Sequence, residues 1–104
     1  MVSEKTGEHI AYLRALIESL KYRRENELKP QLAVLNQLYY SMNRSKYFNP
    51  KSYETKMLFR RINATKEDLK QTNLLITKYK LELQDFIEQK DIFYKKLREI
   101  RGRE

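Results

Sequence analysis

The chain contains no cysteine and no tryptophan, and only two glycines and two prolines among its 104 residues. Without cysteine there can be no disulfide, cysteine-ligated zinc site or thiol nucleophile, and a reducing compartment is permitted. With so few glycines and prolines, most of the chain has no local reason to leave a helix. All apolar runs fall short of the roughly 18 residues of a membrane span, and the opening residues lack a signal-peptide core. We therefore expect a helical protein of the cytoplasm or nucleus with no membrane span.

Motifs that carry catalysis are lacking as well. There is no glycine-rich phosphate loop, no nucleophile elbow and no paired carboxylates in an apolar setting. The single histidine, His9, has only Glu8 as an acidic neighbour at helical spacing, which predicts a solvated side chain near the end of the chain. We expect no enzymatic activity, cofactor, metal site or small-molecule substrate.

What the sequence does contain is a heptad pattern that runs without interruption from Thr55 to Ile100. With Ile62 taken as an a position, ten of the fourteen a and d residues are apolar or aromatic. Such spacing keeps one seam of a helix against a partner through a left-handed supercoil. The a positions hold Thr55, Ile62, Leu69, Ile76, Leu83, Lys90 and Leu97, and the d positions hold Leu58, Thr65, Thr72, Tyr79, Phe86, Phe93 and Ile100. The pattern predicts a coiled coil.

A second apolar stripe precedes the heptads and predicts a helix over about residues 7–43. Asn49 and Pro50 suit a helix cap and first position, so we expect a loop at about 44–50 and a second helix at about 50–101. The first stripe holds Ile10, Leu13, Ile17, Leu20, Leu28, Leu32, Leu35, Tyr39 and Met42, with Arg24 between Leu20 and Leu28. The alternative is two amphipathic helices that do not pair with each other.

If the chain folds back at Tyr47-Phe48, the two stripes match position by position. The numbers of paired residues sum to 97 near the fold-back, as for Leu35 with Ile62, and to 96 farther out, as for Leu13 with Leu83. This change in register, from a sum of 97 to a sum of 96, falls where the first stripe has one residue more than a heptad allows. We expect a bend at Pro30 to absorb the extra residue. Arg24 would face Thr72 in the seam, either as a polar layer or, as we expect, extended into water along its stem.

Positive charge is concentrated at the fold-back. Residues 29–66 hold eight basic residues and one acidic residue, Glu54, so this segment carries +7 of the net charge of +8. Elsewhere opposite charges lie four residues apart, which stabilises a helix slightly. These pairs are Arg14/Glu18, Lys21/Glu25, Arg23/Glu27, Lys78/Glu82 and Asp91/Lys95. Near the fold-back, residues of like charge lie four residues apart, as in Lys56/Arg60 and Lys66/Lys70. Such pairs repel unless an anion lies across them.

Aromatic side chains accompany these cations. Mixed cations and aromatics are typical of single-stranded nucleic-acid binding, and they also suit an acidic protein or lipid headgroups. We expect each aromatic on its own to pack against the end of the hairpin; the aromatics are Tyr39, Tyr40, Tyr47, Phe48 and Tyr53. The candidate tip residues are Arg44, Lys46, Tyr47, Phe48, Lys51, Lys56, Arg60, Arg61 and Lys66. The alternative is that the cations only keep this end in solution.

The far end of the second helix offers another candidate surface. A first helix that ends near Gly7 lies opposite residue 89, which leaves Lys90 to Ile100 without a partner in the chain. The apolar residues there are Ile92, Phe93, Leu97 and Ile100. Leu16, Leu75, Leu81 and Ile87 also lie beside the seam. Exposed apolar area costs roughly 25 cal/mol per Å², so we expect self-association into four helices or a second protein to cover it. The alternative is a frayed C-terminus.

Together these patterns predict an all-α protein in which residues 1–104 form a single antiparallel coiled-coil hairpin. Its second helix is the longer one and overhangs at the C-terminus. The interpretation of function is a non-enzymatic subunit or adaptor of a larger assembly, which uses the overhang for assembly and the basic tip to contact an anionic partner. The alternative is a nucleic-acid-binding protein whose basic, tyrosine-rich tip carries the main activity.

Overall fold

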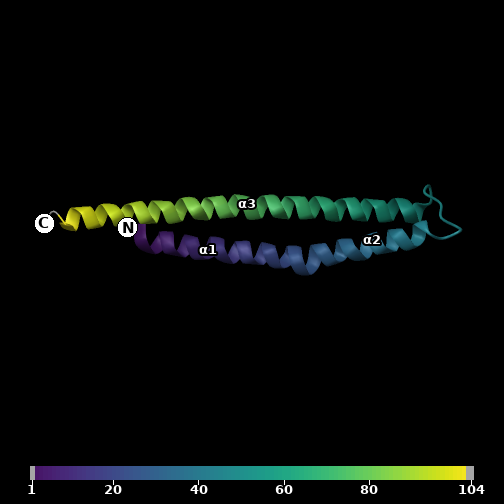
Figure 1. Cartoon of the computed structure of the whole chain (residues 1–104), viewed down its shortest axis with the longest axis horizontal. Coiled ribbons are helices and arrows are strands. Elements are labelled where there is room, and N and C mark those ends of the chain that lie inside the picture. Colours follow the sequence, from purple (N-terminus) through teal and green to yellow (C-terminus); the bar gives the residue numbers. More distant parts are fainter. Residues whose placement is uncertain (1, 103–104) are drawn as a thin grey trace.

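The described structure is a helical hairpin whose two arms are joined by a loop. The computed structural model describes residues 2–102, and the side chains of residues 7–102. The first arm runs through helix α1, Val2–Arg23, the π-helical turn η1, Arg24–Leu28, and helix α2, Lys29–Asn43. The second arm is helix α3, Tyr53–Gly102. The arms lie antiparallel in a rod of 84 × 18 × 17 Å, and α3 extends past the start of α1 (Figure 1). The predicted all-α hairpin with a longer second helix is confirmed.

The helix boundaries differ from the predicted ones. α1 begins at Val2, not near residue 7, because Gly7 costs a helix only about 1 kcal/mol and does not end it. α3 begins at Tyr53, three residues later than predicted. Pro50 therefore lies in the loop and does not take the first position of the helix.

Ser52, and not Asn49, caps α3. The Oγ atom of Ser52 accepts a hydrogen bond from the backbone N–H of Thr55 at 3.2 Å. The Thr55 hydroxyl donates to the carbonyl oxygen of Asn49 at 3.0 Å and lies 2.8 Å from the Ser52 hydroxyl. The Asn49 side chain is used elsewhere, since its Oδ1 accepts from the backbone N–H of Lys51 at 2.9 Å. Thr55 is 1% exposed, so one buried threonine fastens the loop to the end of the seam.

The seam between the arms consists of the predicted residues. In the first arm its buried side chains are Ile10, Leu13, Ile17, Leu28 and Leu35, and in α3 they are Thr55, Leu58, Ile62, Thr65, Thr72 and Ile76. Near the loop, Leu35, Leu58 and Ile62 form a cluster against which Leu32, Tyr39 and Met42 pack. The Thr65 hydroxyl donates to the carbonyl oxygen of Arg61 at 2.9 Å, so this polar group is satisfied inside the seam.

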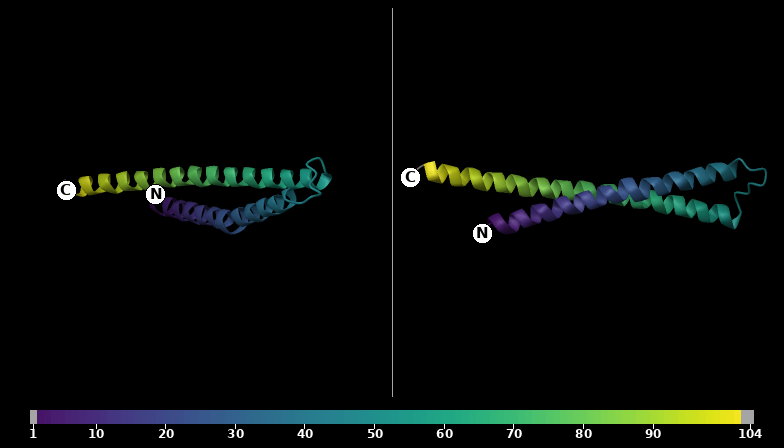
Figure 2. Two further views of the ribbon diagram at one scale, coloured as in Figure 1. Left: turned by 45° about the vertical axis from the view of Figure 1, so that its right-hand side comes forward. Right: turned by 90° about the horizontal axis from the view of Figure 1, so that it is seen from below.

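The turn η1 accommodates the extra residue of the first stripe. Here the backbone N–H of Lys29 donates to the carbonyl oxygen of Arg24, five residues back, which is the π-helical pattern. The Asn26 side chain donates to the carbonyl oxygen of Tyr22 at 3.1 Å. The first arm bends at this turn (Figure 2). The expected bend is present, but the π turn absorbs the residue, and Pro30 follows in the first turn of α2.

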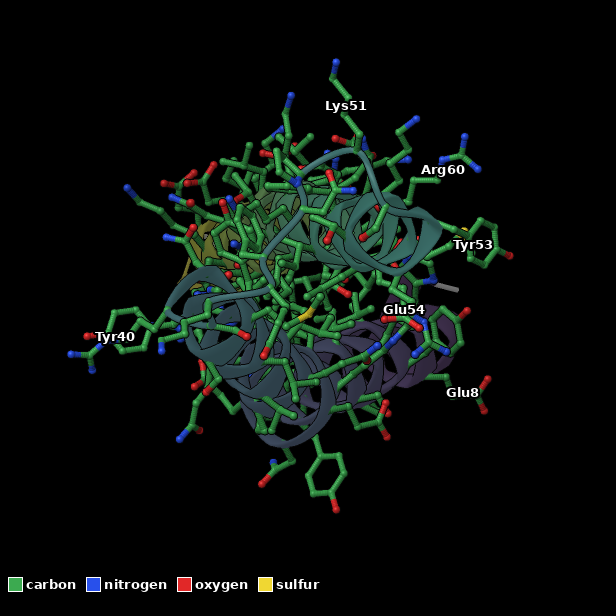
Figure 3. The ribbon with its side chains drawn as sticks, turned by 90° about the vertical axis from the view of Figure 1, so that its right-hand side faces the viewer. Glu8, Tyr40, Lys51, Tyr53, Glu54 and Arg60 are labelled. Atoms are coloured by element: carbon green, nitrogen blue, oxygen red, sulfur yellow. The ribbon has the colours of Figure 1, made fainter. Side chains whose placement is uncertain are left out.

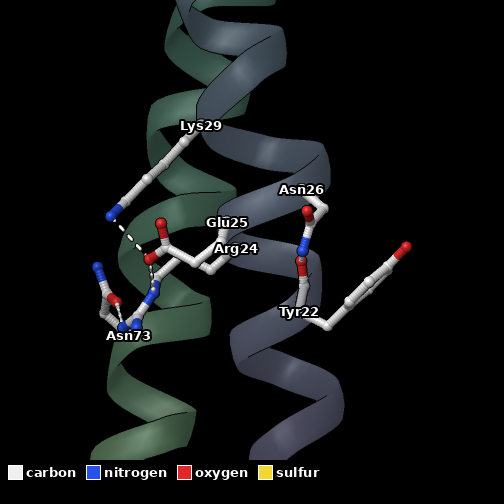
Figure 4. A network of polar contacts seen from close by, with 6 residues as sticks. All are labelled: Tyr22, Arg24, Glu25, Asn26, Lys29 and Asn73. Atoms are coloured by element: carbon white, nitrogen blue, oxygen red, sulfur yellow. Dashed lines mark hydrogen bonds and ion pairs between the residues drawn. The ribbon is translucent and has the colours of Figure 1, made fainter.

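Arg24 does not form a polar layer with Thr72; its stem carries the guanidinium to the exposed edge of the seam, as expected, where it bonds to residues of both arms. Its Nη1 donates to Oδ1 of Asn73 on α3 at 2.9 Å, and its Nε donates to Oε1 of Glu25 at 2.9 Å (Figure 4). The same Glu25 oxygen accepts from Nζ of Lys29 at 2.8 Å. The Lys29 hydrogen bond, with a smaller contribution from Arg24, holds the pKa of Glu25 below the usual range of a glutamate. The arms are thus joined beside the π turn by a polar contact.

Candidate interaction surfaces

The predicted basic residues meet at the loop end of the rod but do not share one face. Seen end on, Lys51 and Arg60 point away from α2, whereas Tyr40 and Tyr53 point to opposite sides of the hairpin (Figure 3). All the predicted basic residues of the tip are exposed, namely Arg44, Lys46, Lys51, Lys56, Arg60, Arg61 and Lys66. Since the Arg44 guanidinium lies over the Tyr40 ring, positive charge is present on at least two sides of this end of the rod.

The tip aromatics divide into two groups. The Tyr39 ring packs 4.7 Å from that of Phe59 and meets Phe48 edge to face at 6.2 Å, centroid to centroid, so Phe48 closes the seam. By contrast, Tyr40, Tyr47 and Tyr53 are 58%, 91% and 76% exposed. The expectation that each aromatic packs against the hairpin is wrong for these three, because they lie off the seam.

An apolar groove that was not predicted from the sequence follows α2 and the start of α3. We call it the α2–α3 groove and define it by Pro30, Val34, Leu38, Tyr53, Met57 and Arg61. It comprises two hollows of about 420 Å³ each, and both are lined by Leu38 and Arg61. Val34 is 58% and Leu38 51% exposed. The sequence feature that could have indicated this groove is the recurrence of Pro30, Val34 and Leu38 every four residues beside the seam.

One basic and one acidic residue lie in this groove. Arg61 borders both hollows, whereas Glu54 borders only the one nearer the loop. Arg60, the neighbour of Arg61, lines neither hollow. Both arginines were predicted to lie at the tip, but only Arg61 borders the groove.

The C-terminal surface is shorter than predicted. Because α1 begins at Val2 and not near Gly7, the first arm reaches farther along α3 than expected (Figure 1). Leu97 and Ile100 lie in the part of α3 that continues beyond it (Figure 1). Ile92, Phe93 and Ile100 are 55%, 36% and 57% exposed, and Leu97 is half-buried.

His9 is not a solvated side chain, contrary to expectation. Its ring centroid lies 4.4 Å from that of Phe86 on α3, and its Nε2 lies 3.4 Å from Oε1 of Glu82. These partners come from the opposite arm, so neighbours along one helix do not reveal them. His9 therefore joins the two arms near the far end of the seam.

The charged pairs on the sides of the rod also differ in part from those predicted. Arg23 and Glu27 approach to 3.9 Å as predicted, but Lys21 pairs with Glu18 at 3.7 Å and Glu25 pairs with Lys29. Exposed pairs of this kind contribute about 0–1 kcal/mol each, so alternative partners differ little in energy.

Comparison with known proteins adds no assignment, because no protein-family model, curated protein or solved structure matches the chain. Across the described helices, no stretch is both long and apolar enough to cross a membrane. Within residues 2–102, no three histidine, aspartate or glutamate side chains gather closely enough to hold a metal ion.

Proposed function

We propose that the protein is a non-enzymatic subunit or adaptor of a larger assembly, located in the cytoplasm or nucleus. One observation carries the proposal: among the described side chains, eight apolar ones are buried between the arms, whereas fifteen large apolar or aromatic ones are exposed. Two helices can bury only one seam, so further apolar surface needs another chain to cover it. Exposed area of this kind costs roughly 25 cal/mol per Å² and is typical of interaction surfaces.

The basic tip supports contact with an anionic partner. Its cations are exposed, and residues 29–66 carry only one acidic residue against eight basic ones. An acidic protein surface would relieve the repulsion within Lys56/Arg60 and Lys66/Lys70. Such charge complementarity mainly raises the rate and specificity of association.

Nucleic-acid binding is the second candidate, and the exposure of Tyr40, Tyr47 and Tyr53 favours it. The Arg44 guanidinium lies 5.2 Å from the centre of the Tyr40 ring, a pairing that could stack on a base. However, Tyr40 and Tyr53 point to opposite sides (Figure 3), so they do not form one continuous platform for successive bases. For this reason the protein partner ranks first.

Gentle isolation of the tagged full chain from its own source tests the subunit role. We expect a stoichiometric protein partner, and sedimentation should show a complex that survives nuclease treatment. Replacement of Phe93 and Leu97 by Ser should release a partner or lower the mass, while circular dichroism stays helical. A parent chain that sediments as a monomer without any protein partner contradicts the subunit role. A complex that contains only nucleic acid, with affinity falling steeply with salt, supports the alternative.

A further inference from the structure

The α2–α3 groove has the chemistry expected of a site for a third helix. Its floor lies between two adjacent helices, and its apolar residues Pro30, Val34 and Leu38 recur at one-turn intervals along α2. Helices pack at 8–10 Å between axes, and an amphipathic helix presents apolar side chains at the same one-turn interval. The walls of the groove are helices whose backbone groups bond internally, so an occupant must bind through side chains and not as an added strand.

Charge decides which kind of helix would bind. Arg61 borders both hollows, and the surrounding segment, residues 29–66, carries a net charge of +7, although Lys51 and Arg60 of that segment point away from α2 (Figure 3). Glu54, the one acidic residue of that segment, borders only the hollow nearer the loop. An occupant with acidic residues on the flanks of its apolar face would meet Arg61 midway along the groove. A basic occupant would meet like charge, which costs affinity.

The same charge argues against a second copy of this chain. A twofold symmetric dimer through the groove would bring the same surface of both copies together, and with it two segments of net charge +7. Their repulsion would oppose an association whose apolar core is limited to a few side chains. The charge therefore favours a different, acidic protein over a second copy.

We infer that the α2–α3 groove binds an acidic amphipathic helix of a partner protein. The inference rests on the proposed subunit role and assigns that role a surface and a partner chemistry. Leu38 supplies the central apolar contact and Arg61 the charge that selects acidic partners.

Two synthetic helical peptides provide the probe. Both carry leucine at positions i, i+4, i+7 and i+11; one has glutamate on its polar face, and the other has lysine at the same places. We expect the full chain to bind the glutamate peptide at least about tenfold more tightly than the lysine peptide in fluorescence anisotropy at moderate salt. Equal binding of both peptides, or of neither, overturns the inference.

Matched variants locate the binding. Leu38→Glu should weaken binding of the glutamate peptide at least tenfold, which corresponds to about 1.4 kcal/mol. Leu74→Glu is the control, because Leu74 is 55% exposed against 51% for Leu38 but lines no groove wall. Arg61→Glu should weaken binding several-fold more than Arg60→Glu, although both change the net charge equally. Equal losses within each pair overturn the inference, and the arginine pair decides the outcome if Leu38→Glu fails to fold.

Two further measurements separate this inference from the proposed function. Sedimentation of the parent chain should show no dimer through the groove. A dimer that is present in the parent and lost in Leu38→Glu would assign the groove to a second copy. If the natively isolated partner stays bound to the Leu38→Glu chain, the groove assignment is wrong and the subunit role stands. Absence of any protein partner from the parent contradicts the subunit role itself.

Discussion

The two halves of the rod bury similar seams but present different sides to their surroundings. In the half far from the loop, residues 7–28 with 67–102, opposite charges pair on the surface and His9 meets Glu82 across the arms. In the tip half, residues 29–66, exposed cations surround the loop and an apolar groove follows α2. Each half contains a well-buried part of the seam, represented by Leu13 at 1% and Ile62 at 4% exposure.

This difference shows that the residues that stabilise the fold are not the residues that differ between the two surfaces. Surface ion pairs contribute about 0–1 kcal/mol each, so the charge pattern of the far half adds little to folding. Burial of one leucine or isoleucine contributes roughly 1.5–3 kcal/mol, and both halves have such residues in the seam. We conclude that the seam holds the rod together in both halves. Both halves also expose apolar side chains, so what distinguishes the surface of the tip half is its net positive charge.

The largest expected effect concerns the step in register between the halves. Deletion of Asn26 removes the extra residue at η1, and we expect the arms to stay paired in one continuous register, with stability equal to or above that of the parent. Deletion of Asn63, also an exposed asparagine, shifts half of the α3 seam and should unfold the hairpin, since several buried side chains at roughly 1.5–3 kcal/mol each are displaced. Urea unfolding followed by circular dichroism compares them. Equal damage from both deletions would show that the π turn is not what accommodates the step.

The next effect tests whether both halves depend on the seam to the same degree. Leu13→Ala in the far half and Ile62→Ala in the tip half should each lower the free energy of unfolding by about 2–5 kcal/mol, because each leaves a cavity between the arms. Leu81→Ala is the control, with Leu81 58% exposed, and should change it by less than about 0.5 kcal/mol. A cost for Ile62→Ala near that of the control would mean that the tip half is held by something other than its seam.

A smaller effect is expected where the tip half ends. Thr55→Val keeps the shape of the side chain but removes the hydroxyl that binds the carbonyl oxygen of Asn49 and contacts Ser52. We expect a loss of about 0.5–1.5 kcal/mol, since the hydrogen bonds of the buried Thr55 hydroxyl are removed while the Asn49 carbonyl oxygen keeps the backbone N–H of Ser52 as a donor. Amide hydrogen exchange should increase in the loop and the first turn of α3, while α1 keeps its protection. Uniform acceleration along the chain would contradict a local role for Thr55.

The smallest effect lies at the junction of the halves and depends on pH. The pKa of Glu25 is held below its usual range by Lys29 and Arg24, so the charged form is favoured in the folded state. Its stabilising contribution is therefore present at neutral pH and is lost as the pH falls through the lowered pKa. Glu25→Gln should be slightly less stable than the parent at neutral pH, and the difference should vanish in acid. A difference that persists in acid would assign the effect to packing.

Some features could be read from single residues and their spacing. The 4–3 alternation from Thr55 onward placed Leu58, Ile62, Thr65, Thr72 and Ile76 in the seam, and all of them are buried. A seam position depends on helical periodicity alone, so the antiparallel hairpin and the location of the register step were also predictable. Helix ends were less so, because Gly7 is tolerated inside a helix and the cap on α3 came from Ser52 and not Asn49.

Only the tertiary structure determines the contacts between residues that are far apart in the chain. His9 contacts Phe86 and Glu82, and Arg24 donates a hydrogen bond to Asn73, because the antiparallel register places these residues at the same level of the two arms. The α2–α3 groove likewise needs residues of two helices, so neither stripe alone reveals it. The sequence by itself determined the seam, since burial there follows from the periodicity of each helix. The structure determined the surfaces, since they depend on how two helices are placed side by side.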